Sequence, residues 1–401
     1  MVTVPATSPA PTPTEPRAYL DHAATTALRP EVREAYLEAC GVLGNPTSVH
    51  ASGRRARAVL DHALDSLCAD LDVPHSWIVL TSGGTEADNL ALRGVSRARH
   101  ASDPDRRAVL VCATDHAAVV QTASSLAPEI EARIAPVRRD GILDLEAAEA
   151  LLADDAVAVT SAALVNNETG IVQDISGLSA RARAHGTLVH TDAVQGLGHT
   201  ALPSWDDVDL MSLSGHKVGA PVGVGALIVK PEIPVAAGST GGGQQRGIRS
   251  GTLDAAHAAA FAAAVHATLA DAEAEQARLR ALSARLRAGL RAIDHDVRFT
   301  AAEDTPQTGH IVHVAFPGAH HDSLLYLLDE RGVDASTGSA CSAGVHRGSH
   351  VLEAMGVDPG TARGALRLSL GWSSSEADVD RVLDALPEAL RRARAVGELF
   401  A

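Results

Sequence analysis

Between residues 76 and 230, short apolar runs rich in β-branched residues alternate with stretches of helical periodicity. The runs predict strands at 77–80, 108–113, 156–165, 187–191, 209–213 and 224–229. The stretches between them predict helices, among them 85–99, 117–126 and 175–185. Strands that alternate with helices form parallel sheets covered on both faces. We therefore expect an α/β fold around one large, mostly parallel sheet.

A second, smaller set of elements follows toward the C-terminus. Residues 252–292 predict a long, interrupted helix, followed by a strand, a helix, a strand and a helix at 310–316, 322–329, 365–370 and 376–394. We expect a disordered tail at 1–17, a large domain at 18–262 and a small C-terminal α/β domain at 263–401. The first residues of the large domain can pack on the small one.

The composition is that of a globular protein and removes several classes of function. The chain is 46% hydrophobic and 2% aromatic, and its formal net charge is −15 without a long basic run, so we expect no nucleic-acid partner. No apolar run has membrane-spanning length, so we expect no membrane partner. The 4 cysteines form no C-x-x-C pair and residues 1–16 lack Lys and Arg, which favours a cytoplasmic protein.

Lysine is scarce in this chain. Of 34 basic residues only Lys217 and Lys230 are lysines, so surface charge is otherwise supplied by Arg. Lys217 follows an apolar strand and is flanked by Ser214 and His216, side chains able to contact a phosphate. This pattern favours a Schiff-base lysine for pyridoxal phosphate over a simple loop lysine. Lys230, which precedes Pro231, is interpreted as a surface charge.

Polar residues also end two other strands. Asp192 lies about 25 residues before Lys217, where its carboxylate could keep a pyridine nitrogen protonated; a helix N-cap is the alternative. Asn167 could hydrogen-bond the phenolic oxygen of the same cofactor, or only shape a turn.

One glycine-rich loop lies between a predicted strand and helix. Gly84 and Thr85 belong to Thr81-Ser82-Gly83-Gly84-Thr85-Glu86, where backbone N–H groups and hydroxyls suit a phosphate, although an ordinary capped helix explains the loop equally well. Neither the dinucleotide-binding pattern nor the P-loop pattern occurs, which disfavours those two enzyme classes.

Cys341 lies in a run of small residues, 336–344, without hydrophobic periodicity, so an exposed nucleophilic thiol is plausible there. The other cysteines fall in helical or strand patterns and are interpreted as inert. Arg367 is a single charge inside an apolar strand and needs an anionic partner, either a substrate carboxylate or a structural acid.

Histidines are frequent, but they do not indicate a metal site. The 19 histidines include no H-E-x-x-H motif and no Cys/His cluster, so we expect no metal. His116 ends a strand and fits a ring stacked on a planar cofactor or a proton shuttle, or a histidine hydrogen-bonded near a helix start.

Together these motifs resemble the cysteine desulfurases, pyridoxal-phosphate enzymes of the class V aminotransferase group, and are most like actinobacterial members. The resemblance extends from about Tyr19 to Leu386. It is carried, in the order of the family, by residues 19–26, 44–46, 81–90, 165–170, 190–195, 212–217, 241–253, 336–341 and 367–371. It implies fold type I, similar to aspartate aminotransferase, with cofactor residues on the large domain and the cysteine loop on the small one.

The resemblance also implies a role for each matching residue. Lys217 is the Schiff-base lysine, Asp192 pairs with the pyridine nitrogen, and His116 stacks on the ring. The phenolic oxygen and the phosphate are contacted by Asn167, Gln195, Gly84, Thr85, Ser214 and His216, with Thr252 supplied by the other subunit of a homodimer that shares its active sites. Asn45 and Arg367 hold the substrate carboxylate, and Cys341 takes the sulfur.

The implied reaction converts L-cysteine to L-alanine and leaves a persulfide on Cys341 for a protein acceptor, such as an iron–sulfur scaffold or a tRNA-thiolation protein. Selenocysteine lyase or a related class V enzyme is the alternative within the group, and a non-catalytic scaffold is the alternative outside it. The sequence identifies neither the acceptor nor the group that deprotonates Cys341.

Overall fold

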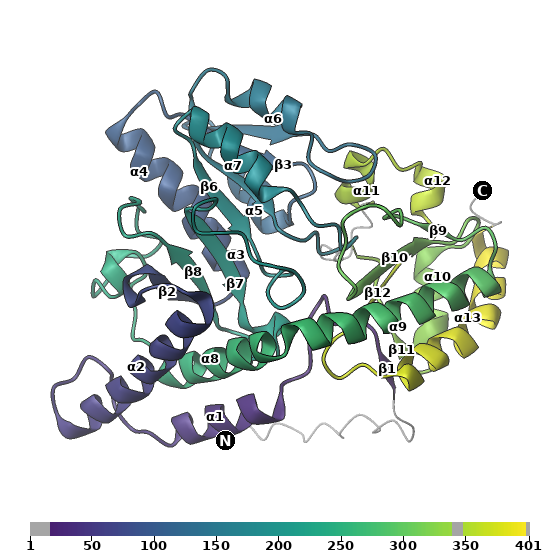
Figure 1. Ribbon diagram of the computed structural model, residues 1–401, viewed down its shortest axis with the longest axis horizontal. Coiled ribbons are helices and arrows are strands. Elements are labelled where there is room, and N and C mark those ends of the chain that lie inside the picture. The colour runs from purple at the N-terminus through teal and green to yellow at the C-terminus, as the bar shows by residue number, and fades with distance from the viewer. Residues whose placement is uncertain (1–16, 339–347, 398–401) are drawn as a thin grey trace, which may run out of the picture.

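The computed structural model describes residues 17–338 and 348–397 and shows a large and a small α/β body (Figure 1). The expectation of an α/β fold with a large, mostly parallel sheet is confirmed. The sheet has 7 strands in the order β2-β8-β7-β6-β5-β3-β4. Its strands are β2 Ile78–Thr81, β3 Ala108–Cys112, β4 Glu131–Ala135, β5 Val157–Ala163, β6 Leu188–Asp192, β7 Leu210–Ser214 and β8 Gly225–Val229.

Strand direction determines where the chain can place functional side chains. β4, β3, β5, β6 and β7 are mutually parallel, and β8 runs antiparallel to both β7 and β2. β2 is therefore parallel to β7, so the carboxyl ends of β2, β3, β5, β6 and β7 lie at one edge of the sheet. The edge strand β4 was not expected from the sequence, because its Glu131-Ala-Arg-Ile-Ala run is short and carries two charges.

Helices cover both faces of the sheet, each with its own hydrophobic core. One core joins the sheet to α2, α6, α7 and α8, and the other joins it to α5 and the helical run of α3 and α4. A π-helical turn, Leu90–Gly94, connects α3 to α4. The helices of this body are α1 Pro30–Cys40, α2 Ala51–Leu71, α3 Gly84–Asn89, α4 Val95–Ser102, α5 Ala117–Ser124, α6 Leu145–Leu152, α7 Ile175–Ala184 and α8 Ala255–Ala270, with 3₁₀ turns at His75–Trp77, Gly215–Lys217 and Gln245–Gly247.

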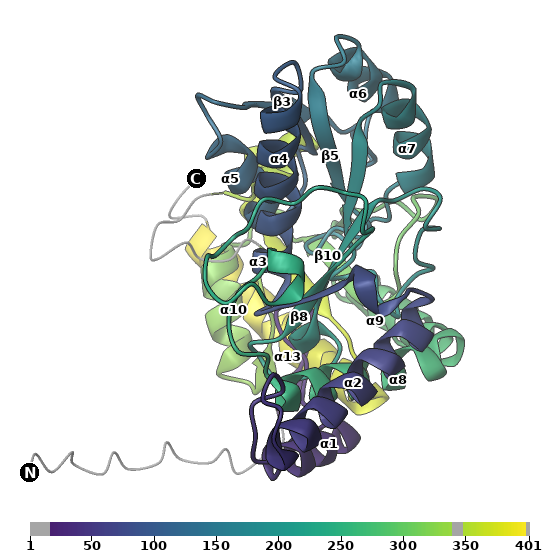
Figure 2. The ribbon, with the colours of Figure 1, turned by 90° about the vertical axis from the view of Figure 1, so that its left-hand side faces the viewer.

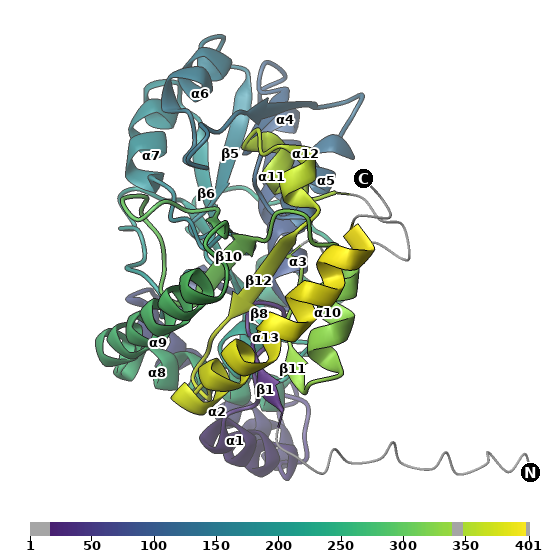
Figure 3. The same ribbon diagram turned by 90° about the vertical axis from the view of Figure 1, so that its right-hand side faces the viewer.

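The small body is built on a 3-stranded antiparallel sheet, β12-β10-β9, and a 2-stranded parallel pair, β1-β11. Helices α9, α10 and α13 pack on these strands around a separate core (Figure 3). The bounds are β1 Ala18–Tyr19, α9 Ala272–Ile293, β9 Arg298–Phe299, β10 Ile311–Ala315, α10 His321–Asp329, β11 Val333–Asp334, α11 His350–Ala354, α12 Pro359–Ala362, β12 Ala365–Ser369 and α13 Glu376–Gly397.

Two consecutive helices, α8 and α9, belong to different hydrophobic cores. α8 packs against α1 and α2 and contributes side chains up to Val265 to the core of the large body, whereas α9 contributes to the core of the small body (Figure 2). The division expected between residues 262 and 263 therefore falls inside α8. α8 is mostly Ala, so its small side chains fit closely against neighbouring helices.

One N-terminal segment connects the two bodies. Leu20 is fully buried in the core of the small body, and Asp21 bridges to Ser369 at the end of β12. A few residues further on, the carbonyl groups of Ala23 and Ala24 accept hydrogen bonds from Lys217 in the large body. The segment therefore starts in one core and reaches the carboxyl edge of the other body's sheet.

No helix among residues 17–338 and 348–397 is long and apolar enough to cross a membrane. In the same described part of the chain, no group of three or more His, Cys, Asp or Glu side chains could hold a metal ion.

The burial of Leu20 leads to a stability prediction. Leu20→Ala removes a fully buried side chain and should lower the free energy of unfolding by about 2–5 kcal/mol, measured by urea denaturation. Leu28→Ala, at a position 40% exposed in the same segment, is the control and should cost less than about 1 kcal/mol. Equal effects of the two variants would show that the segment does not depend on this core.

Candidate active site

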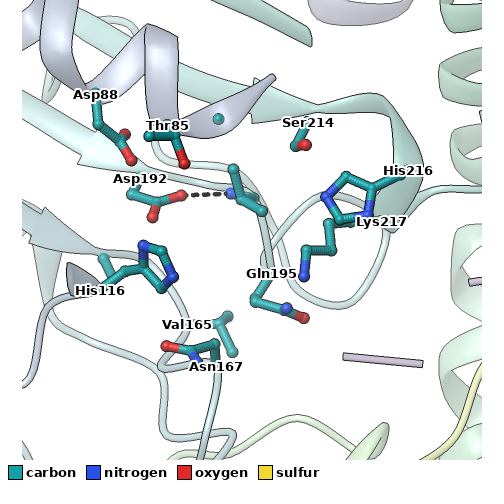
Figure 4. Close-up of a pocket in the computed structure, with 13 residues that line it drawn as sticks. Thr85, Asp88, His116, Val165, Asn167, Asp192, Gln195, Ser214, His216 and Lys217 are labelled. Carbon is teal, nitrogen blue, oxygen red and sulfur yellow. Dashed lines mark hydrogen bonds between the residues drawn. The ribbon is translucent and has the colours of Figure 1, made fainter. Parts of the chain in front are cut away.

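A cavity of about 250 Å³ opens at the carboxyl edge of the large sheet. Each part of its wall follows the end of a strand: β2, β3, β5, β6 or β7. Figure 4 shows the side chains around this space. The lining residues are Gly84, Thr85, Asp88, His116, Ala163, Val165, Asn167, Asp192, Val194, Gln195, Ser214, His216 and Lys217.

The start of α3 forms one wall of the cavity. Gly83 has φ of 150°, and a Cβ on Gly84 would lie 2.8 Å from Val194 Cγ2, so glycine lets the backbone approach closely here. The first N–H groups of a helix have no partner within the helix. With the hydroxyl groups of Thr85 and Ser214 beside them, these N–H groups form an environment suited to an anion.

The amine of Lys217 reaches the opposite side of the cavity (Figure 4). Its Nζ donates hydrogen bonds to the carbonyl oxygens of Ala23 at 2.6 Å and Ala24 at 2.7 Å. Burial lowers the pKa of Lys217 to about 8, and the positive charge of Arg367 acts in the same direction. Lys217 is therefore neutral in about a tenth of molecules at pH 7, far more than an ordinary lysine.

Asp192 faces this amine from the end of β6. It is 7% exposed, and its Oδ1 accepts a hydrogen bond from the backbone N–H of Val194 at 2.9 Å. Burial raises the pKa of Asp192, while His116 and Lys217 act against that rise. Within the described part of the chain Asp192 forms no ion pair, and a further cationic group in the cavity would stabilise its ionised form.

His116 is the N-cap residue of α5, and its ring borders the cavity. Its Nδ1 accepts a hydrogen bond from Ala118 N–H at 3.1 Å, which places the proton of the neutral ring on Nε2. Burial lowers the pKa of His116, and the nearby Lys217 amine contributes to this shift. The two alternatives from the sequence thus coincide: His116 caps a helix and also lines the cavity.

The amide side chains of Asn167 and Gln195 form the lower wall in Figure 4. Gln195 donates from Nε2 to the Ala23 carbonyl at 2.8 Å, and its Oε1 lies 3.3 Å from His310 Nε2. The Gln195 side chain is therefore held in one orientation by groups outside the cavity. On the other side, His216 contacts the Thr25 hydroxyl at 3.2 Å, and burial lowers the pKa of His216 to about 4.

Arg367 is 3% exposed in β12 and does not line the cavity. Its guanidinium donates to Asp21 Oδ1 at 2.8 Å and to the carbonyl oxygen of Asn167 at 2.8 Å. Its Nε, also buried, has no hydrogen-bond partner among the described residues. The sequence left two anionic partners open for Arg367, a structural acid and a substrate carboxylate. Asp21 is the structural acid, and the Nε–H group of Arg367 is still free to bind a carboxylate.

Two further residues expected at the site do not line this cavity, and a third is not described. Asn45 is exposed between α1 and α2, where its Oδ1 accepts hydrogen bonds from Thr47, so the structure does not bring Asn45 to this cavity. Thr252 is also exposed and away from the cavity of its own chain. Cys341 lies outside the described residues.

Sequence reasoning missed three features of the site. Asp88 lines the cavity, Asp21 pairs with Arg367, and the Ala23 and Ala24 carbonyls bind Lys217. Asp88 could have been found, because it follows Gly84 by four residues and so shares its helix face. Nothing in the local sequence indicates the backbone carbonyl contacts.

Comparisons with known proteins agree with this fold. The family model for class V aminotransferases matches residues 18–382, so the chain belongs to the class V aminotransferase family. It is 42% identical over 381 residues to the "IscS-like cysteine desulfurase" of Mycobacterium tuberculosis, covering 94% of this chain and 97% of that protein. This agrees with the expected similarity to actinobacterial members.

Solved structures show the same architecture. A "NifS-like protein" superposes with a TM-score of 0.86 at 29% identity, covering 94% of this chain and 100% of the other. The structure titled "SspA in complex with cysteine" superposes with a TM-score of 0.74 at 27% identity, covering 89% and 100%.

The low pKa of Lys217 can be measured directly, because the chain has only two lysines. We expect one of two ¹³Cε-lysine NMR signals, recorded on protein freed of small molecules, to titrate with a midpoint of about 8. Lys217→Arg should remove that signal and thereby assign it. A midpoint at the ordinary lysine value of about 10.4 would contradict the buried environment described here.

Proposed function

We propose that this chain is a pyridoxal-phosphate-dependent cysteine desulfurase that converts L-cysteine to L-alanine. The observation that carries the proposal is the cavity in which an amine with lowered pKa, Lys217, faces a buried carboxyl group, Asp192. The near full-length similarity to a cysteine desulfurase supports the same activity.

The residues of the cavity fit pyridoxal phosphate. The cofactor supplies an aldehyde that condenses with amines and a protonated pyridine ring that withdraws electrons from the substrate. Lys217 would hold the aldehyde, Asp192 would hold the ring nitrogen, and His116 would lie against the ring. The phosphate would be held by the α3 N-terminus together with Thr85, Ser214 and His216, and Asn167 and Gln195 would hold the phenolic oxygen.

The free Nε of Arg367 supports a role in holding the substrate carboxylate. The guanidinium lies just behind the cavity wall. It donates a hydrogen bond to the carbonyl oxygen of Asn167, a residue that lines the cavity. A carboxylate there would compete with Asp21 for the same guanidinium. Asn45 would reach a substrate only in the cavity of another subunit, since it is exposed in its own chain.

Two groups can move protons in the cavity. The neutral form of Lys217 can accept the proton that the substrate Cα loses, because burial favours its uncharged state. His116, with its proton on Nε2, can exchange a proton with the substrate or with a thiol.

The sulfur goes to Cys341 in this proposal. Its thiolate attacks the sulfur of the substrate, the carbon–sulfur bond breaks, and a sulfur–sulfur bond forms on the enzyme. The substrate carbon gains a proton and leaves as alanine, so the step needs no external oxidant or reductant. A protein such as an iron–sulfur scaffold would then accept the sulfur from Cys341.

A homodimer with shared active sites is supported by the surface around α1 and α2. Leu37, Leu43 and Val49 are 62%, 82% and 88% exposed, an unusual set of large apolar side chains. Thr252 and Asn45 are exposed as well. A second copy covering these elements would bury the apolar side chains and could place Thr252 at the phosphate of its partner.

The cofactor assignment predicts a single site of attachment. Borohydride reduction of the protein with pyridoxal phosphate should fix the cofactor on Lys217, detected by peptide mass spectrometry. Lys217→Ala should lose this label and about 10²–10⁴-fold of the turnover, whereas the control Lys230→Ala should keep both. A normal label in Lys217→Ala would overturn the assignment.

The nucleophile assignment makes a separate prediction. Cys341→Ala should lose the persulfide that forms with L-cysteine, because only a thiol at this position can take the sulfur, while the label on Lys217 remains. Cys40→Ala, at an exposed cysteine of α1, should keep the persulfide. Mass spectrometry of the protein after treatment with L-cysteine gives the answer, and sulfur transfer that survives in Cys341→Ala would exclude Cys341 as the nucleophile.

A further inference from the structure

The cavity contains a second carboxyl group besides that of Asp192. Asp88 lies on α3, is 1% exposed and lines the cavity. Figure 4 shows its carboxyl group pointing toward Asp192. Its Oδ1 has no hydrogen-bond partner among the described residues. None of the steps derived above uses this group.

A pair of hydrogen bonds lies next to Asp88. Fully buried His190 has Nδ1 2.9 Å from Ser161 Oγ and Nε2 2.9 Å from Ser212 Oγ. Both ring nitrogens are satisfied if Ser161 donates to His190 and His190 donates to Ser212. The Ser212 hydroxyl lowers the pKa of Asp88, against the larger effect of burial. Oδ1 of Asp88 receives no hydrogen bond from the described residues.

The charges around Asp88 do not favour a carboxylate. Within residues 17–338 and 348–397 it forms no ion pair with Lys or Arg. The titratable groups that face it are Asp192, Asp115 and His190, whose Nε2 is 3.8 Å from Asp88 Oδ1. Burial lowers the pKa of His190 to about 3, so that ring is neutral. A buried carboxylate with two acids and a neutral ring around it is strongly disfavoured.

We propose that Asp88 is held as the neutral carboxylic acid, with its proton on the free Oδ1, and acts as a positioning residue that leaves Asp192 as the single anion of the pair. The carboxyl group of Asp88 then faces Asp192 as a neutral group (Figure 4). The role of Asp192 toward a cofactor rests on the proposed function, whereas the protonation state of Asp88 does not.

The proposal determines how stability depends on pH. Burial raises the pKa of Asp88 well above its ordinary value, so the folded protein holds a proton that the unfolded chain releases above about pH 4. The contribution of this group to stability is therefore complete at low pH and is lost as the pH rises. A neutral side chain of the same shape, such as Asn, does not ionise, so its contribution to stability does not fall as the pH rises.

The test is the melting temperature of wild type and Asp88→Asn, with and without added pyridoxal phosphate, between pH 4 and 8. We expect the melting temperature of Asp88→Asn to rise above that of wild type as the pH increases, by at least about 2 °C at pH 8. Asp304→Asn, at an exposed aspartate, is the matched control and should show no such trend. A difference that is flat, or that falls with pH, would overturn the proposal.

Two further variants keep the test decisive. In the Asp192→Asn background the gain from Asp88→Asn should shrink but persist, because burial and Asp115 also raise the pKa of Asp88. An unchanged gain would show that Asp192 is not the anion. If Asp88→Asn does not fold, Asp88→Ser replaces it; failure of both neutral variants would mean that the charge is required and would refute the proposal.

The cofactor label separates this inference from the proposed function. Asp88→Asn should still carry borohydride-fixed pyridoxal phosphate on Lys217, because the replacement keeps a neutral donor. Loss of the label only in Asp88→Asn would contradict the neutral acid. Absence of the label in wild type would refute the proposed function and leave the stability result intact.

Discussion

The hydrogen bonds from the Lys217 amine to the carbonyl oxygens of Ala23 and Ala24 are the contact on which the rest of the site depends. Carbonyl oxygens hold an amine in place but bring no negative charge, so burial can lower its pKa to about 8. The segment that supplies them is anchored by Leu20 in the core of the small body. The position and the basicity of the amine therefore both depend on how the two bodies are joined.

Burial also changes the pKa values of the acids on the other side of the cavity. Three carboxyl groups, those of Asp88, Asp115 and Asp192, are almost fully buried near one another. Asp115 accepts two backbone N–H bonds, yet burial still raises its pKa to about 8. The cationic ring nitrogen of the proposed cofactor would need one anion and not three, and the different hydrogen-bond partners of these acids explain how one can be selected.

The sequence predicted the sheet well because its strands are buried apolar runs, and the residues after those runs necessarily meet at one edge. Nine expected residues line the cavity for that reason, from Gly84 to Lys217. The sequence could not predict the partners of Lys217 and Arg367, which are backbone carbonyls and an acid far away in the chain. Asn45 and Thr252 lie away from the cavity of their own chain, so their expected roles depend on the proposed second subunit. Asp88 was missed because its helix reads as an ordinary capped helix.

The cavity is expected to break the carbon–sulfur bond of L-cysteine and to retain the sulfur on the protein. The decisive experiment supplies L-cysteine to the protein loaded with pyridoxal phosphate and measures alanine together with protein-bound and released sulfur. We expect alanine and sulfur in equal amounts, with part of the sulfur on the protein in the first turnover. Pyruvate and ammonia in place of alanine, or no reaction at all, would contradict this expectation.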